Sequence, residues 1–189
     1  MSDALSELHQ LLGDFEESGL PPVHTWDPET CGEMDLEIHR DGSWWYQGTP
    51  IERKRLIKLF SRVLRKEGSD YYLVTPVEKL KIRVDDAPFL AVRMEQLETD
   101  AGLLLIFEDN CDNRVAAGAK HPLRVDIRPG TREPAPYIRI RNGLDALIAR
   151  PLFYDLVTLA TPRNIGGREA MTLCSGDACF ILGYLDGKS

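Results

Sequence analysis

The stretch that decides the fold is Leu36-Glu37-Ile38-His39-Arg40-Asp41-Gly42-Ser43-Trp44-Trp45-Tyr46, in which two strand-like runs flank Asp41-Gly42. Asp-Gly tolerates the positive φ of a type I′ turn, so the stretch predicts a β-hairpin with a two-residue loop. In that register Ile38 faces Trp45. Because successive side chains alternate between the faces of a strand, we expect Trp45 on the apolar face and Trp44 and Tyr46 on the polar face.

A helix is predicted directly after this hairpin. Thr49-Pro50-Ile51-Glu52 combines an N-cap threonine, a proline at the first helical position and a glutamate three residues after the cap. Basic residues occupy most positions outside the apolar stripe, and we interpret them as a solvated face rather than a phosphate-binding patch. Gly68 is expected to end the helix, and a strand is expected at 71–75. The apolar stripe consists of Leu56, Leu59, Phe60, Val63 and Leu64.

The second half of the chain repeats this order of parts. The runs 125–130 and 137–141 form a second hairpin pattern with a longer turn. Setting Leu144 against Ile51 superposes Asp145 on Glu52 and aligns the following apolar stripe, which includes Phe153, Leu156 and Val157. Pro151 should kink or restart this second helix near Arg150. We therefore predict an internal duplication in which 36–75 corresponds to 125–182.

These patterns predict an α+β fold of two similar subdomains, each an antiparallel hairpin or sheet with one packed helix. Leucines at helical spacing in 4–12 indicate a short N-terminal helix, and a proline-rich connector follows. The expected organisation is an N-terminal helix and linker over 1–21, a first repeat domain over 22–88 and a second over 89–189.

Composition narrows the class of protein. The chain has 189 residues, of which 43% are hydrophobic, and a formal net charge of −7 at pH 7, which argues against general nucleic-acid binding. Its longest apolar runs are far below the about 20 residues that a membrane span needs. Four cysteines without a Cys-x-x-Cys pair, and no secretion signal, argue against a disulfide framework and favour a cytoplasmic protein.

Six short motifs resemble an uncharacterised bacterial family, domain of unknown function 1285. The resemblance implies a duplicated two-domain body whose C-terminal half is superficially like a pleckstrin-homology fold. It also implies a ligand site between the domains, a nucleotide-like ligand and a role in signal transduction. The acidic stretch 108–112 departs from the pattern. The motifs are Trp26-Asp27-Pro28, Cys31-Gly32, Arg40-Asp41-Gly42-Ser43-Trp44, Gly48-Thr49-Pro50-Ile51, Leu73-Val74-Thr75-Pro76-Val77-Glu78-Lys79 and His121-Pro122-Leu123-Arg124-Val125.

Common signatures of catalysis are absent from the sequence. It contains no phosphate-binding loop, zinc-binding His-Glu-x-x-His helix or Gly-x-Ser-x-Gly nucleophile motif. The glycine-rich run 163–168 is interpreted as a surface loop. The histidines and cysteines match no standard metal site, so we expect no metal and no cofactor. The charged pairs Glu78/Lys79 and Asp85/Asp86 are read as solvated strand ends rather than acid-base groups.

The polar faces of the two hairpins form the candidate binding surface. Aromatic rings beside guanidinium groups suit a base and a phosphate, through stacking and bidentate hydrogen bonding. We predict a non-enzymatic ligand-binding or regulatory module with a small-molecule site at the interface of the repeats. The alternatives are a hydrolase or transferase, and a protein-interaction scaffold in which these residues only cover the helix or the sister domain. The predicted site residues are Trp44, Tyr46, Glu78, Lys79, His121, Tyr137, Arg139 and Arg141.

Overall fold

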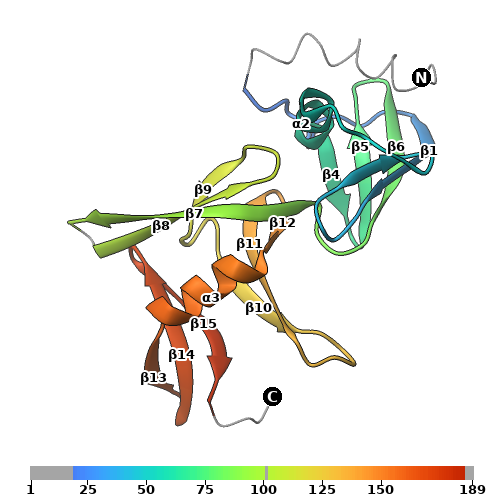
Figure 1. Cartoon of the computed structure of the whole chain (residues 1–189). Coiled ribbons are helices and arrows are strands. Elements are labelled where there is room, and N and C mark those ends of the chain that lie inside the picture. Colours follow the sequence, from blue (N-terminus) through green and yellow to red (C-terminus); the bar gives the residue numbers. More distant parts are fainter. Residues whose placement is uncertain (1–18, 101, 186–189) are drawn as a thin grey trace. The chain divides into compact units, whose positions relative to one another are not determined.

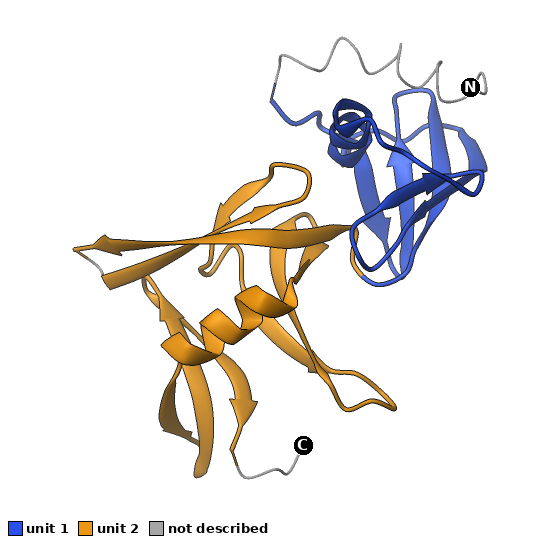
Figure 2. Ribbon diagram, in the orientation of Figure 1, with its two compact units in different colours: residues 1–86 blue, residues 87–189 orange. Residues whose placement is uncertain are grey.

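The computed structural model describes residues 19–100 and 102–185 (Figure 1). The chain divides into two compact units, of which the first ends at Asp86 and the second begins at Ala87 (Figure 2). The helix predicted within 4–12 lies outside the described residues. No helix in the described part of the chain is long and apolar enough to cross a bilayer.

The first unit is a six-stranded sheet with one helix, α2 (Lys54–Arg62). The strand order is β3-β2-β1-β6-β5-β4, and β1 runs parallel to β6 while all other neighbours are antiparallel. Two three-stranded meanders are thus joined through one parallel pair. The strands are β1 (Thr30–Ile38), β2 (Trp44–Tyr46), β3 (Thr49–Pro50), β4 (Leu64–Glu67), β5 (Asp70–Val74) and β6 (Glu78–Val84).

The second unit contains another six-stranded sheet, with the order β10-β11-β12-β7-β8-β9, and a separate sheet β13-β14-β15. In the six-stranded sheet, β7 runs parallel to β12. The helix α3 (Arg150–Leu159) follows β12 and leads into the three-stranded sheet. The strands are β7 (Phe89–Thr99), β8 (Gly102–Asp109), β9 (Arg114–Ala116), β10 (Leu123–Ile127), β11 (Pro134–Arg141), β12 (Leu144–Ile148), β13 (Thr161–Ile165), β14 (Arg168–Ser175) and β15 (Ala178–Tyr184).

The two six-stranded sheets have the same topology, which fits an internal duplication. We number the strands of each sheet in chain order and read the second sheet from β9 to β10. The strand order is then third, second, first, sixth, fifth, fourth in both sheets. This match sets β1–β6 against β7–β12, so the register differs from the predicted one of 36–75 against 125–182. In this alignment of the two sheets the helices do not correspond, because α2 connects the two meanders of the first sheet whereas α3 follows the second sheet.

The β1–β2 hairpin is present, but its register differs from the prediction by one residue. The backbone N–H of His39 donates to Ser43 O, and Gly42 has a φ of 82°, so the loop has three residues and closes with glycine in the left-handed region. Ile38 consequently pairs with Trp44, not with Trp45. A shift of one residue moves every side chain of a strand to the other face.

Helix α2 begins later and ends earlier than predicted. Thr49 and Pro50 continue the sheet as β3 by pairing with β2, and the N-cap is Arg53, which makes no side-chain capping bond. At the other end, Leu64 begins β4, which forms a tight hairpin with β5 around Gly68. The capping-box prediction was therefore wrong, since sheet pairing competes for the same residues.

The core of the first unit matches the predicted apolar stripe. Phe60 is fully buried, and Leu59, Val63 and Leu64 are at most 2% exposed. This confirms the phase of the helix even though Val63 and Leu64 lie beyond its end. Val63 and Leu64 stay in the core because β4 begins directly after the helix, at Leu64.

In the second unit the predicted helix start at Leu144 was wrong, because Leu144–Ile148 is strand β12. Helix α3 begins at Arg150 with Pro151 in its first turn, as that proline suggested. Leu156 is fully buried and Phe153 half-buried, but Val157 is exposed, contrary to the prediction. Val157 lies about 100° around the helix from Leu156, outside the buried row.

One disulfide contradicts the expectation of free cysteines. Cys174 on β14 is bonded to Cys179 on β15. Cys31 is exposed and Cys111 is buried, and neither belongs to this disulfide. A sequence separation of five residues shows no strand register by itself, which is why spacing alone could not identify the pair.

Candidate ligand-binding site

The predicted site residues of the first hairpin do not form a polar face. Trp44 is 1% exposed and belongs to the core, together with Leu36 and Ile38. The expectation that Trp44 lies on the open face was therefore wrong, because the three-residue loop shifts the pairing of the two strands by one residue. Trp45 occupies that position and stacks on His39 at 5.3 Å between ring centroids. Tyr46 pairs with Leu36 and is half-buried.

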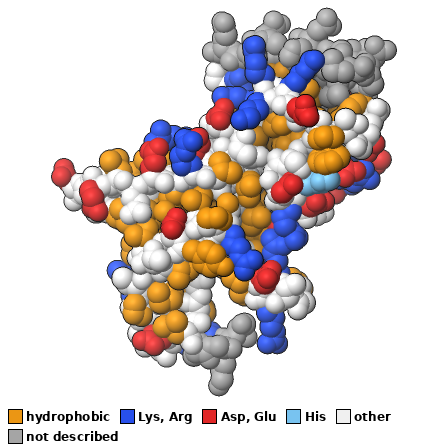
Figure 3. Space-filling view, in the orientation of Figure 1, with side chains coloured by type: hydrophobic (Ala, Val, Ile, Leu, Met, Phe, Trp, Pro, Cys, Tyr) orange, Lys and Arg blue, Asp and Glu red, His pale blue; other side chains and the backbone are white. Residues whose placement is uncertain are grey.

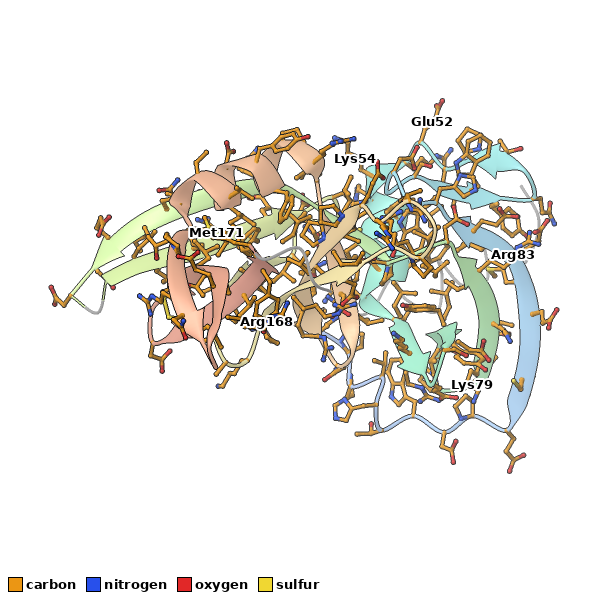
Figure 4. All side chains as sticks on the ribbon, turned by 90° about the horizontal axis from the view of Figure 1, so that it is seen from below. Glu52, Lys54, Lys79, Arg83, Arg168 and Met171 are labelled. Carbon is orange, nitrogen blue, oxygen red and sulfur yellow. A yellow bond between two sulfur atoms is a disulfide. The ribbon has the colours of Figure 1, made fainter. Side chains whose placement is uncertain are left out.

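Lys79 and Glu78 lie at the start of β6 and have local partners. Lys79 Nζ is 3.0 Å from Glu67 Oε2 and lies over the ring of Tyr72 (Figure 4). The hydrogen bond between them lowers the pKa of Glu67 and raises the pKa of Lys79. The backbone N–H of Glu78 donates to Thr75 Oγ1 at 3.1 Å, which caps the turn between β5 and β6.

The outer face of β1, β4, β5 and β6 carries matched charges, and we call it the paired face. Arg83 contacts both Asp35 and Glu37, and Lys81 contacts Asp70 at 3.0 Å. These side chains are between 34% and 66% exposed. Each charge already has an opposite neighbour in water, so the face is typical of a solvated surface.

The second unit brings charged residues together in a different way. Arg124 on β10 and Arg139 on β11 both bind the carboxylate of Asp145 on β12. Arg124 Nη1 is 3.0 Å from Asp145 Oδ2, while Arg139 donates from Nε to Asp145 Oδ1. The side chain of Asp145 is 10% exposed, compared with 45% for Arg124 and 39% for Arg139. We call Arg124, Tyr137, Arg139 and Asp145 the arginine cluster.

Two further predicted residues belong to this region. The guanidinium of Arg124 lies 4.2 Å from the centre of the Tyr137 ring, which is itself buried beside Ala87 and Ala135. His121 Nδ1 is 3.0 Å from the backbone oxygen of Arg139. His121 thus lies next to Arg139, while Tyr137 and Arg139 share one face of β11, as the alternation along that strand predicted.

Arg141 does not join them. The pairing between β11 and β12 shifts between Arg139 and Arg141, so Arg139 faces Asp145 whereas Arg141 faces Leu144. Because Leu144 and Asp145 point to opposite sides of β12, this bulge turns Arg141 to the other face. There it donates to Asn113 Oδ1 at 2.7 Å and lies over Phe89. The expectation that all three residues share one face was wrong for Arg141.

A buried carboxylate, that of Asp109, lies at the end of β8 in the same unit. Burial raises its pKa, as a catalytic acid would require. Its oxygens, however, accept hydrogen bonds from the N–H of Cys111, the N–H of Asn113 and the side chain of Asn113. Asp109 thus closes the turn between β8 and β9. No cluster of three or more His, Cys, Asp or Glu able to hold a metal ion occurs among residues 19–100 and 102–185.

Sequence reasoning missed Arg124 and Asp145. The sequence pattern places Asp145 in a helix cap, and Arg124 belongs to one of the short motifs without a predicted role of its own. The alternation Leu123-Arg124-Val125-Asp126 does indicate a strand with Arg124 on its polar side. Which residue of β12 lies opposite Arg139 depends on the bulge in β11, which no sequence signal shows.

Two family profiles match the chain. The N-terminal domain of DUF1285, a domain of unknown function, matches residues 21–87, and the C-terminal domain of DUF1285 matches residues 88–182. The fold defines a two-domain α+β protein built on two six-stranded sheets of one topology. The chain belongs to the DUF1285 family.

Two solved structures are similar to this chain. A DUF1285 family protein from Silicibacter pomeroyi DSS-3 is 40% identical with a TM-score of 0.87, and the match covers 98% of each chain. A DUF1285 family protein from Shewanella baltica OS155 is 25% identical with a TM-score of 0.53, over 66% of this chain and 91% of that one. No curated protein matches this chain.

Proposed function

We propose that this protein is a non-enzymatic, regulatory ligand-binding module whose small-molecule ligand carries an anionic group. A nucleotide-like ligand and a role in signal transduction agree with this chemistry. The observation that carries the proposal is the arginine cluster, in which two half-exposed guanidinium groups are held by one nearly buried carboxylate.

The cluster holds its arginines in a defined orientation. Asp145 engages Nε of Arg139, and no other hydrogen bond of this guanidinium is formed within the described residues. Its two Nη groups can therefore donate to a ligand, since a guanidinium has five N–H donors in a planar fork. Orienting a donor beforehand reduces the entropy lost on binding.

The charge balance of the cluster favours an anion. The carboxylate of Asp145 compensates one of the two guanidinium groups. Asp126 also contacts Arg124, at 3.2 Å, but its side chain is 55% exposed and its charge is screened by water. Without Asp126, the arginine cluster carries one positive charge in excess, although the net charge of the whole chain is −7.

Base recognition would use the aromatic and imidazole groups beside the arginines. The Tyr137 ring is already covered on one side by Arg124, so it supports that guanidinium. A planar base can stack on the outer side of a guanidinium, as bases do on arginine in nucleic-acid complexes. His121, next to the backbone of Arg139, supplies a further polar edge.

The enzyme alternative has less support. A catalytic carboxylate needs access to a substrate, whereas Asp109 is 2% exposed and saturated by its own loop. The scaffold alternative is favoured by Tyr154 and Val157, which are 56% and 39% exposed on α3. Figure 3 shows hydrophobic side chains over the part of the second unit where Figure 1 places this helix. Single exposed apolar residues are, however, common on monomeric proteins.

The proposal is tested by a thermal-shift screen with nucleoside phosphates and cyclic dinucleotides. Nucleosides without phosphate and inorganic pyrophosphate separate the contributions of base and phosphate. A ligand that binds only the folded state raises the melting temperature. Arg139→Ala should weaken binding by about 1.5 to 3 kcal/mol, the contribution typical of a charge-assisted hydrogen bond.

Arg93→Ala is the matched control. Arg93 lies on β7 of the same unit, is 65% exposed and contacts Glu108, so the same substitution is made outside the cluster. It should leave the shift unchanged. Circular dichroism must show that both variants are folded. A screen without any binder, or a folded Arg139→Ala variant that binds like the wild type, would contradict the proposal.

A further inference from the structure

We propose that Cys174 and Cys179 form a redox-active pair that exchanges with dithiols, and that its state controls the docking of the β14–β15 hairpin on β8. This inference is independent of the ligand proposal. It rests on the position of the pair in the hairpin, on the exposure of one sulfur and on the buried contacts of the turn between the cysteines.

The disulfide is not needed to hold the hairpin together. Cys174 and Cys179 lie directly opposite each other in the antiparallel pairing of β14 and β15, and backbone hydrogen bonds already join these strands. The cross-link spans only five residues. The entropic stabilisation by a disulfide grows with the length of the loop that it closes, so a cross-link over five residues stabilises the fold less than one between distant parts of the chain. A structural role alone is therefore the weaker explanation for it.

The two sulfurs differ in their surroundings. Cys179 is exposed, whereas Cys174 is half-buried. Arg163 on β13, the strand on the other side of β14, places Nη1 3.8 Å from Cys179 Sγ. A guanidinium at this position stabilises a thiolate, and exposed disulfides whose reduced form is stabilised are the easily reduced ones.

The turn between the cysteines is anchored to the six-stranded sheet of the same unit. Ser175 is 1% exposed, and its hydroxyl donates to Ala117 O at 2.8 Å and accepts from Leu105 N at 3.0 Å. The N–H of Gly176 donates to Leu103 O at 2.8 Å. Ser175 follows Cys174 directly, so a movement of Cys174 acts on the residue that docks the hairpin.

The exchange is a balanced two-electron step. A thiolate of the dithiol attacks the exposed Cys179 sulfur, the disulfide bond breaks, and Cys174 leaves as a thiolate that takes up a proton. The second thiol of the reagent then attacks the mixed disulfide and releases Cys179, so the protein gains two electrons and the dithiol becomes a cyclic disulfide. Two thiols require more room than a bonded pair, and the side chains must move apart.

The first experiment measures the redox equilibrium of the full chain with dithiothreitol as the dithiol. Alkylation of free thiols and mass spectrometry give the oxidised fraction at each ratio of reduced to oxidised reagent. Cys31→Ser removes the exposed free thiol and prevents wrong pairing. We expect reversible two-electron titration of the pair. The absence of a 174–179 disulfide under oxidising conditions would overturn the proposal.

Arg163→Ala tests the role of the neighbouring charge. The ratio of reduced to oxidised protein at a fixed buffer composition should fall about two- to fivefold, the effect typical of an exposed charge contact. Arg168→Ala is the control, because Arg168 lies on β14 of the same sheet but stacks on Tyr184 (Figure 4). An equal shift in both variants would contradict the assignment of Arg163.

Hydrogen exchange tests the coupling to docking. Reduction should accelerate exchange of the Leu105 and Gly176 amides about tenfold or more, because both donate across the docked contact. Amides of β5 and β6 in the first unit should not change. Ser175→Ala should make the Leu105 amide exchange rapidly in both redox states. Equal protection of oxidised and reduced wild-type protein would show that the pair does not control docking.

Discussion

The two six-stranded sheets share a strand order but carry their charges differently. On the paired face of the first sheet, acidic and basic side chains meet on the surface, and Arg83 and Asp35 are more than half exposed. In the second sheet, two arginines meet one carboxylate that is only 10% exposed. The same residue types therefore form a solvated surface in one sheet and an oriented, unbalanced cluster in the other.

The two sheets share one topology, so the difference shows that burial determines whether a charged side chain belongs to a solvated surface or to an oriented cluster. An exposed ion pair contributes little, because water screens the attraction and both side chains lose entropy. A nearly buried carboxylate must keep its partners, since leaving it unpaired costs its full desolvation. A duplicated framework can therefore carry a candidate ligand site in only one of its copies.

The helices of the two units provide the largest expected contrast. Phe60→Ala in α2 should lower the free energy of unfolding of the first unit by about 3 to 5 kcal/mol, because it leaves a cavity in the core. Phe153→Ala in α3 should cost about 1 to 2 kcal/mol, since that ring is only half-buried. Urea unfolding measures both costs.

Tryptophan fluorescence separates the two units in this experiment. All three tryptophans of the chain, Trp26, Trp44 and Trp45, belong to the first unit, so their signal follows its unfolding. Far-UV circular dichroism reports on both units. Lys54→Ala, on the exposed side of α2 (Figure 4), should stay within about 0.5 kcal/mol of the wild type. Equal costs for Phe60 and Phe153 would remove the contrast between the helices.

The two charged faces provide the next contrast. Asp145→Ala should lower the free energy of unfolding of the second unit by about 2 to 3 kcal/mol, because two guanidinium groups lose their shared acceptor. Asp35→Ala on the paired face should cost less than about 1 kcal/mol. Added salt should reduce the small cost more than the large one. Similar values for the two aspartates would mean that the burial of Asp145 has no energetic consequence.

The smallest expected effect is a difference in pH dependence. The hydrogen bond from Lys79 lowers the pKa of Glu67 below its ordinary 4.5, so its stabilisation is present above pH 4.5 and is lost as the pH falls through the folded-state pKa. Burial raises the pKa of Asp109 above 3.8, so its contribution has the opposite sign. That contribution is present below pH 3.8 and is lost as the pH rises through the folded-state pKa.

Unfolding in urea between pH 3 and pH 7 measures these opposite slopes. Glu67→Gln should flatten the acid-side loss of stability of the first unit, as followed by tryptophan fluorescence. Asp109→Asn should remove the decline with rising pH from the second unit, as followed by the part of the circular dichroism change that tryptophan fluorescence does not report. A change of the same sign in both variants would contradict the assigned pKa directions.

The local elements and the strongly patterned buried residues can be predicted from the amino-acid sequence alone. Asp41-Gly42 between two strand-like runs specifies a hairpin, because few sequences tolerate positive φ at that position. The apolar spacing of Leu59, Phe60 and Val63 places one side of a helix in the core. The order of parts in the two halves also indicated a duplication, and the polar side of β11 indicated Tyr137 and Arg139.

Strand register and side-chain partners, by contrast, depend on tertiary contacts. A loop of three residues rather than two buries Trp44 instead of Trp45, and the bulge after Arg139 separates Arg141 from the cluster. Both features change which face a side chain occupies without changing the alternation that the sequence displays. The pairing of β14 with β15 is local, but its register across the short turn, which sets Cys174 opposite Cys179, is likewise not shown by the sequence spacing. Local propensity is too weak to determine such pairings, because the energy that selects them comes from contacts formed after the chain has folded back on itself.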